Sequence, residues 1–419
     1  MAGRTMQNPG DESMISNIEL TNQLSYLLDK ERNERLESQL PPDTSPSNII
    51  ANILSPSSVV ITSSPSTLIR QSQQGPALGY LRIGFGQCGI TCERPGRDYV
   101  VKLARPAYKQ GLWADFQAHF MVREASQQKA NKNAECRVPR LFSWIPESKT
   151  KWWDKNRFLF PEISGLLPLP TPALVTEHIL PLPKIARQAL IERYCPPGLQ
   201  ANVSADPTNR DCLARLYLGS RRQRPELLSP NFTLRNFNLH LDQMLEMELP
   251  VLLFASAMGE ALAIIHWAAH VDGYDIEFVL GSEADAYSVY NQDIAVSLKL
   301  TPQQVLGMSS HEDLDAKLRT NFKQRSTRMW VLDFNLCHIW PEEIALSEPD
   351  GLVSHLVQAF FDNDPYYPRP HGEGDIEREL WDAFATTYSQ KAEQILQDKD
   401  KRLVDLPSRF INACISYVK

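Results

Sequence analysis

A glycine-rich turn between apolar runs constrains the fold of this sequence more than any other feature. The runs lie within residues 80–103, which read YLRIGFGQCGITCERPGRDYVVKL. Short apolar runs that flank glycines and a polar turn are typical of a β-hairpin, which we expect here. Residues 84–89, GFGQCG, have the spacing G-x-G-x-x-G. Because this run joins strands rather than a strand to a helix, it disfavours a Rossmann dinucleotide site.

Two interpretations of Gly84, Gly86 and Gly89 follow from the run alone. Glycines let backbone N–H groups approach a phosphate closely, and they also occur wherever a hairpin turns tightly. Lys102 comes shortly afterwards, at the end of the apolar strand VVKL. A buried lysine needs a carboxylate partner, so Lys102 beside the glycines favours a phosphate-binding loop. The alternative for Lys102 is an edge lysine that points to solvent.

The partner of Lys102 is expected on the helix predicted for residues 111–130. Apolar residues at helical spacing mark one face of this stretch, GLWADFQAHFMVREASQQKA. Glu124 is the favoured partner and Asp115 the alternative. Two further strands are predicted in VPRLFSWIP and ALVTEHILPLP, which together with the hairpin give a small sheet with one helix.

The second half of the chain is predicted to be mainly helical, and it carries a group of carboxylates. A long apolar helix should begin at Pro250 and end in the loop HVDGYDIEFVLG, which holds Asp272, Asp275 and Glu277. Carboxylates this close repel one another unless they share a metal or a proton; the alternative is a helix-terminating loop with solvated acids. The strand RMWVLDFNLC then brings Asp333 to the end of an apolar run.

Composition bounds the class of protein. Residues 1–75 are rich in Ser, Pro, Asn and Gln, and we expect a disordered tail with one amphipathic helix that offers a surface for a protein partner. A net charge of -7 argues against nucleic-acid binding. We expect no membrane span, because no uncharged apolar stretch appears long enough in the sequence. The seven cysteines, with no secretory signal ahead of them, predict reduced thiols and a cytoplasmic or nuclear location.

Taken in order, these features resemble the protein-kinase and aminoglycoside-phosphotransferase-like superfamily over roughly residues 79–400. His270-Val271-Asp272 looks like the H-R-D triplet of kinases, and residues 333–335, DFN, look like D-F-G. The resemblance implies an α+β, two-lobed fold. Its small antiparallel N-lobe would span 76–180, and its mainly helical C-lobe would span 181–419 with an insert at 282–327.

The resemblance also implies ATP and Mg²⁺ as cofactors and a role for each matching residue. The glycine loop and Lys102 would position the nucleotide phosphates, Glu124 would orient Lys102, and Glu177 with the backbone after it would hold the adenine edge. Asp272 would accept a proton from the acceptor. The metal ligands would be Asp333 and Glu277, the latter standing where the family has an asparagine.

Three departures from the family pattern leave a second interpretation open. Val271 replaces the arginine of H-R-D, Asn335 replaces the glycine of D-F-G, and 61 residues separate Asp272 from Asp333. No A-P-E-like end of an activation loop follows, so a small-molecule acceptor is favoured over a protein substrate. The alternative is a pseudokinase, which binds nucleotide or a partner without transfer.

A closer resemblance links stretches such as ARQALIERYCPP and FFDNDPYYPRP to a fungal family of uncharacterised proteins. Some of its members are labelled zinc-finger proteins. Cys88 and Cys92 in CGITC are the nearest approach to half a zinc site in this chain, and the sequence shows no second Cys/His pair at finger-like spacing. The resemblance therefore adds little biochemistry, and function has to be argued from the site.

Overall fold

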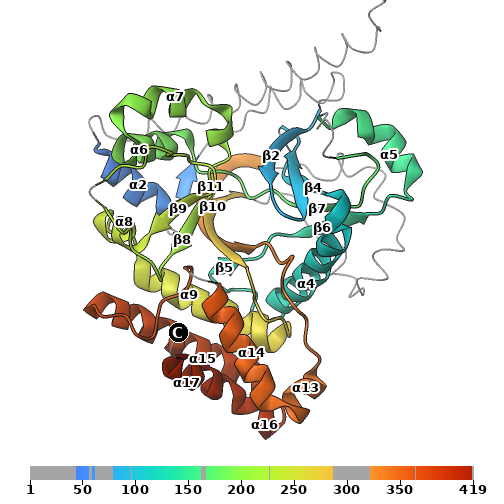
Figure 1. The fold of residues 1–419 in the computed structure, drawn as a ribbon, viewed down its shortest axis with the longest axis vertical. Helices are drawn as coiled ribbons and strands as arrows, with labels where there is room; N and C mark the ends of the chain where they lie inside the picture. The colour runs from blue at the N-terminus through green and yellow to red at the C-terminus, as the bar shows by residue number, and fades with distance from the viewer. Residues whose placement is uncertain are drawn as a thin grey trace, which may run out of the picture.

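Two separate β-sheets, with helices around them, form an α+β protein (Figure 1). The computed structural model describes residues 44–55, 59–61, 79–95, 97–161, 167–225, 227–285, 321–363 and 365–417.

The first sheet is antiparallel and confirms the predicted hairpin. Its strand order is β2-β3-β4-β7-β6. The strands are β2 (Leu81–Phe85), β3 (Gly89–Glu93), β4 (Tyr99–Ala104), β6 (Leu141–Ile145) and β7 (Ala173–Glu177). The register pairs Thr91 with Lys102 and Lys102 with Leu174, so this lysine lies on the central strand rather than on an edge.

Each face of this sheet packs on an apolar cluster. Helix α4 (Lys109–Gln127) covers one face with Leu112, Phe116 and Phe120. The other face packs on an aromatic group that includes Trp153 and Phe160, supplied by the segment of α5 (Thr150–Asn156) and η2 (Arg157–Leu159). The sheet is therefore fixed between two layers, and β4 and α4 hold a defined relative position.

Most of the second sheet lies in the half of the chain that was predicted to be mainly helical, while β1 and β5 join it from the first half, and its size was not foreseen. Its order is β1-β11-β10-β8-β9, and β5 pairs in parallel with β11. The strands are β1 (Val59–Ile61), β5 (Cys136–Arg137), β8 (Ala214–Tyr217), β9 (Phe237–His240), β10 (Glu277–Asp285) and β11 (Asn321–Leu332). The ends of the expected insert at 282–327 continue the β10–β11 hairpin, and its middle lies outside the described residues.

Helices surround the second sheet, and the longest ones form the lower layer in Figure 1. They are α6 (Lys184–Tyr194), α7 (Gln200–Ala205), α8 (Leu241–Glu246), α9 (Val251–Ala263), α13 (Glu342–Ser347), α14 (Pro349–Asp362), α15 (Asp375–Leu396), α16 (Lys401–Val404) and α17 (Leu406–Ser416). Short 3-10 turns occupy Pro106–Tyr108, Pro197–Leu199 and Pro207–Arg210. Gly259 lets α9 and α15 touch, because a Cβ there would lie 2.3 Å from the Phe384 carbonyl oxygen.

Helix α9 corrects the expectation that no stretch is apolar enough to span a membrane. It continues as a π-helical turn over Ile264–Ala268. The window Val251–Ala268 has a mean hydropathy of 1.6, which meets the length and composition of a membrane span. Since 72% of this window is buried inside the protein, its apolar character is explained by packing in the core.

The expectation that residues 1–75 form a disordered tail is also corrected, for residues 46–54. Helix α2 (Pro46–Leu54) begins after Ser45, whose hydroxyl accepts a hydrogen bond from the Asn48 N–H at 3.3 Å, a standard N-cap. It buries Ile50, Ile53 and Leu54 and lies beside α6 (Figure 1). The helix expected near residues 18–40 lies outside the described residues.

Candidate functional site

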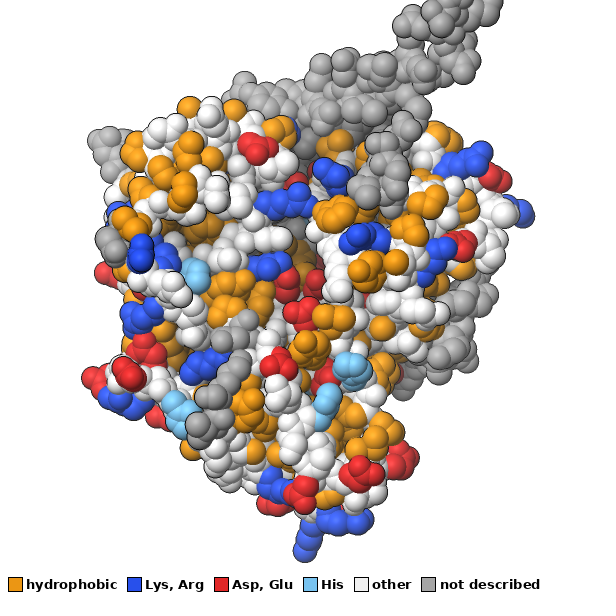
Figure 2. All heavy atoms as spheres, viewed as in Figure 1, with side chains coloured by type: hydrophobic (Ala, Val, Ile, Leu, Met, Phe, Trp, Pro, Cys, Tyr) orange, Lys and Arg blue, Asp and Glu red, His pale blue; other side chains and the backbone are white. Residues whose placement is uncertain are grey.

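A cleft of about 400 Å³ lies between the two sheets and is lined by both. Figure 2 shows acidic side chains gathered in a hollow at the centre of one face. Six of the nine predicted site residues line the cleft, namely Gly84, Gly86, Lys102, Glu177, Glu277 and Asp333. The remaining three, Gly89, Glu124 and Asp272, do not.

The Lys102 ammonium lies between two carboxylates in this cleft. Its Nζ is 2.7 Å from Asp115 Oδ2 and 2.8 Å from Asp333 Oδ1. Burial alone would lower the pKa of Lys102, but the two carboxylates outweigh burial and raise the pKa well above its usual value. Lys102 is therefore a fixed cation, and it links the first sheet to the end of β11.

The prediction that Glu124 is the partner of Lys102 is wrong; the partner is Asp115. Nine residues separate the two acids, which is 2.5 helical turns, so Glu124 projects from the opposite side of α4. Asp115 is buried, and its second oxygen accepts a hydrogen bond from the Phe334 N–H at 3.1 Å. Asp115 thus ties α4 to the backbone after Asp333 as well as to the lysine.

Close packing leaves no room for a side chain at two of the three glycines of the turn, since a Cβ on Gly84 would lie 3.0 Å from Thr91 Cβ and Gly89 is tighter still. The Gly86 N–H donates to the Gly89 carbonyl oxygen at 2.9 Å, which closes a tight turn. A Cβ on Gly89 would lie 2.9 Å from Lys102 Cγ and 3.0 Å from the Leu103 oxygen. Gly89 therefore makes room for the lysine stem, whereas Gly84 and Gly86 face the cleft.

Acids from the second sheet form the opposite wall. Burial raises the pKa of Glu277 to about 7. The positive charge of Arg215, which forms an ion pair with Glu277, lowers this pKa, whereas the negative charges of Asp333 and Asp275 raise it further. Burial and the charge of Asp333 also raise the pKa of Asp275. A group of carboxylates that resist ionisation is typical of a site that receives a cation.

Backbone strain concentrates at this cleft. The non-glycine residues with positive φ in the described part of the chain are Asn236, Glu248, His270, Asp275 and Asp333. Three of them, Asn236, Asp275 and Asp333, line the cleft. Left-handed backbone is uncommon outside glycine, although Asn and Asp tolerate it best, and it is enriched at functional sites.

The segment after β7 closes one end of the cleft. Glu177 forms an ion pair with Arg140 at 2.8 Å, and its other oxygen accepts the Arg140 N–H at 3.0 Å. Leu180 exchanges two backbone hydrogen bonds with Ser282 of β10. Between them, the Ile179 N–H finds no hydrogen-bond acceptor among the described residues. The segment that connects the sheets is therefore anchored at both ends. Near its middle, the Ile179 N–H is a hydrogen-bond donor without an acceptor among the described residues.

Asp272 belongs to a different group of side chains. Its carboxylate is fully buried, and Oδ2 lies 2.9 Å from both His338 Nδ1 and His355 Nε2. The other oxygen accepts the backbone N–H groups of Tyr274 and His338, each at 3.0 Å. The role predicted for Asp272 as proton acceptor stays a prediction, and sequence reasoning missed both histidines because they are 66 and 83 residues further along the chain.

Cys88 and Cys92 are buried core residues. Burial raises the pKa of Cys88 to about 11 and that of Cys92 to about 12. Both thiols are therefore protonated at neutral pH unless a bound cation displaces the proton. Cys88 Sγ lies with carboxylate oxygens of Asp115 and Asp333 in a group whose atoms are all within 4.8 Å of one another, and Cys92 is not part of that group.

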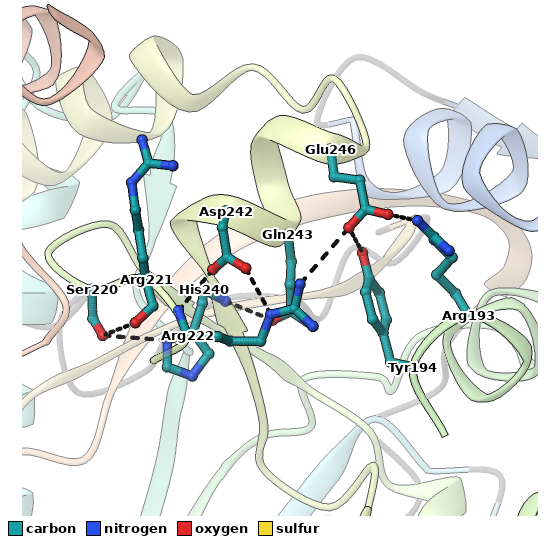
Figure 3. Close-up of polar contacts among 9 residues, drawn as sticks. All are labelled: Arg193, Tyr194, Ser220, Arg221, Arg222, His240, Asp242, Gln243 and Glu246. Carbon is teal, nitrogen blue, oxygen red and sulfur yellow. Dashed lines mark hydrogen bonds and ion pairs between the residues drawn. The ribbon is translucent and has the colours of Figure 1, made fainter. Parts of the chain in front are cut away.

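The basic run after Ser220 is largely paired with acids (Figure 3). Arg222 forms an ion pair with Asp242 at 2.7 Å and lies 3.9 Å from Glu246. Arg221 pairs with Glu377 at 2.7 Å. These contacts fix the loop against α8 and α15.

Comparison with known families gives one partial match. Residues 329–400 match the model of a family described as DUF3669, zinc finger protein. The matched segment contains a single cysteine, Cys337, and three histidines, His338, His355 and His371. No curated protein and no solved structure matches the chain.

Proposed function

We propose that the cleft binds a magnesium–nucleotide complex in a kinase-like, two-lobed arrangement, and that the chain transfers a phosphoryl group to a small hydroxylated or amino-bearing molecule. The observation that carries the proposal is the Lys102 ammonium held between Asp115 and Asp333. One wall of the cleft carries a fixed ammonium beside glycine backbone, which suits phosphate oxygens. The other wall carries acids, which suit the counter-cation of the phosphates.

The nucleotide would enter with its base toward the segment after β7. The Ile179 N–H would donate to the adenine edge, and apolar side chains such as Val100, Leu174 and Leu332 would lie against the ring. Lys102 and the backbone near Gly86 would contact the phosphates. The fit is supported by an apolar end and a charged end within one cleft.

Asp333 and Glu277 suit Mg²⁺, since hard carboxylate oxygens are its preferred protein ligands. The raised pKa of Glu277, about 7, agrees with a carboxyl group that gains a cation on binding. In the transfer step the acceptor oxygen or nitrogen would bond to the γ-phosphorus while the bond to the β-phosphate oxygen breaks. The acceptor proton would pass to a carboxylate, and the diphosphate nucleotide would leave.

Asp272 and Asp275 are the two candidates to take the proton from the phosphoryl acceptor. Asp272 occupies the position of the kinase base in the resemblance, but two imidazoles already contact its carboxylate. Asp275 lines the cleft and has a raised pKa, so it is the better placed acceptor in this geometry.

The engagement of Asp272 also favours a second function, nucleotide binding without transfer. Asn335, in place of the glycine of the D-F-G triplet, is buried after Phe334 and agrees with this alternative. The two functions share the nucleotide site and differ only in turnover.

The test is a titration of the full chain with ATP, with and without Mg²⁺, followed by thermal unfolding. A ligand that binds the folded state must raise its apparent stability. Lys102→Met and Asp333→Asn should abolish the Mg²⁺-dependent shift, whereas Lys109→Met, which removes an exposed ammonium, should keep it. No shift in the wild type at millimolar ATP would refute the nucleotide site. A shift without hydrolysis or transfer to any hydroxylated or amine acceptor would leave the binding function.

A further inference from the structure

Three side chains from separate segments converge on one point outside the cleft. Asp272 follows the π-helical turn after α9, His338 follows β11, and His355 lies on α14. The ligand atoms Asp272 Oδ2, His338 Nδ1 and His355 Nε2 all lie within 4.8 Å of one another. Two imidazole nitrogens and a carboxylate oxygen are a donor set that binds transition metals.

The Asp272 carboxylate is buried and is contacted by two imidazoles and two backbone N–H groups. Its side chain has no exposed surface, and no Lys or Arg forms an ion pair with it in the described part of the chain. A buried carboxylate needs hydrogen bonds or an opposite charge. A divalent cation held by the same three side chains would neutralise the carboxylate charge directly.

We propose that Asp272, His338 and His355 bind a transition-metal ion of the zinc class. The two separations of 2.9 Å between Asp272 Oδ2 and the imidazole nitrogens need to open only slightly, because ligands at about 2.1 Å in a tetrahedron are about 3.4 Å apart. The side chains of His338 and His355 are 71% and 50% exposed, so the fourth position faces solvent. Three protein ligands and one open position are the pattern of a site that holds a reactive water, not of a closed structural site.

The backbone already holds these ligands together. The Asp272 N–H donates to the His338 carbonyl oxygen at 3.0 Å, and the His338 N–H returns a bond to Asp272 Oδ1. Val271 and Ile339 form an isolated antiparallel bridge beside them. Two of the three ligands are therefore fixed before any ion arrives, which favours binding.

The neighbouring thiol of Cys337 is not part of this group of ligand atoms. Cys337 is buried, and its Sγ contacts the Tyr274 carbonyl oxygen at 3.3 Å. The proposed site is thus a nitrogen and oxygen site, unlike a zinc finger, and it differs from the all-oxygen Mg²⁺ set proposed for the cleft.

The experiment uses the full chain after treatment with a chelator. Co²⁺ is titrated while visible absorption is recorded, and Zn²⁺ is then added as competitor. We expect one Co²⁺ per chain with bands of a low-coordinate nitrogen and oxygen site, displaced by one equivalent of Zn²⁺. His338→Ala and His355→Ala should each weaken binding by more than the ~10–100-fold that loss of an outer partner produces. His371→Ala, which removes an exposed histidine of the same segment, should bind like the wild type.

Three outcomes would overturn the proposal. The first is that the wild type does not bind Co²⁺ saturably. The second is that both histidine variants bind Co²⁺ as tightly as the wild type. The third is a thiolate charge-transfer band in the visible spectrum of the Co²⁺ complex. Lys102→Met separates this site from the nucleotide site: it should lose the ATP-dependent shift but keep Co²⁺ binding. Failure of the proposed function and failure of the metal site are therefore observed independently.

Discussion

Replacing Lys102 with methionine tests the central charge arrangement of the cleft. The substitution keeps most of the apolar stem but removes the cation between Asp115 and Asp333, whose side chains are 5% and 30% exposed. Removing one partner of a buried ion pair destabilises proteins by roughly 3–5 kcal/mol. Because Asp333 retains contact with solvent and Asp115 keeps the Phe334 N–H, we expect about 3 kcal/mol at pH 8.

The pH dependence of the Lys102→Met stability penalty tests the charge arrangement more sharply than its size at one pH. The folded pKa of Lys102 lies above its unfolded value, so its contribution to wild-type stability is constant below about pH 10 and is lost only at higher pH. In Lys102→Met, protonating one carboxylate relieves their repulsion, so the penalty should shrink between pH 8 and pH 5. Urea unfolding followed by circular dichroism measures both quantities.

Two further variants test whether the stability loss in Lys102→Met comes from the uncompensated carboxylate charges. Lys109→Met removes an exposed ion pair with Glu147 and should change the free energy of unfolding by less than about 1 kcal/mol. The double variant Lys102→Met/Asp115→Asn should recover part of the loss, since it removes the uncompensated charge. A Lys102→Met penalty no larger than that of Lys109→Met, or one that is equal at pH 5 and pH 8, would refute the reasoning.

Other predictions test single features of the cleft. Asp115→Asn should weaken Mg²⁺-dependent ATP binding at least tenfold, as measured by isothermal titration calorimetry. Glu124→Gln should leave the ATP affinity unchanged in that measurement. Gly89→Ala should lower the free energy of unfolding by about 1–3 kcal/mol in urea, because its methyl group would overlap the Lys102 stem. Folding raises the pKa of Glu277 from 4.5 to about 7, so this group stabilises the fold below about pH 4.5, and that stability is lost as the pH rises through about 7. Glu277→Gln should flatten this part of the stability–pH curve; an unchanged slope would contradict the assignment.

The sequence predicted most local elements because their signals are local. The hairpin with its glycines, the helix over 111–130 and the apolar strand before Asp333 are each encoded within one stretch, and all three are present. Asp115 was ranked behind Glu124 as the partner of Lys102, because helical phase rather than chain order decides which acid meets the strand. The second sheet was underestimated because β5, β8 and β9 contain only two to four residues each.

Long-range contacts explain what sequence reasoning could not reach. His338 and His355 carry no local motif, and they meet Asp272 only because β11 and α14 bring them there. Composition likewise placed residues 44–61 in the tail, since Ser, Pro, Asn and Gln are frequent over residues 1–75 as a whole. Ile50, Ile53 and Leu54 nevertheless lie in the core, where burial of each side chain contributes roughly 1.5–3 kcal/mol.

Strand β1 gives that N-terminal segment a protective role. It pairs with β11 at the margin of the second sheet, with Val59 opposite Ser326 and Ile61 opposite Gln324. A truncation at residue 76, the boundary that composition suggests, would leave the β11 backbone groups unpaired along this margin. Exposed sheet margins recruit strands from other molecules. The shortened protein should therefore self-associate on expression, because strands of other molecules could pair with the part of β11 that β1 covers.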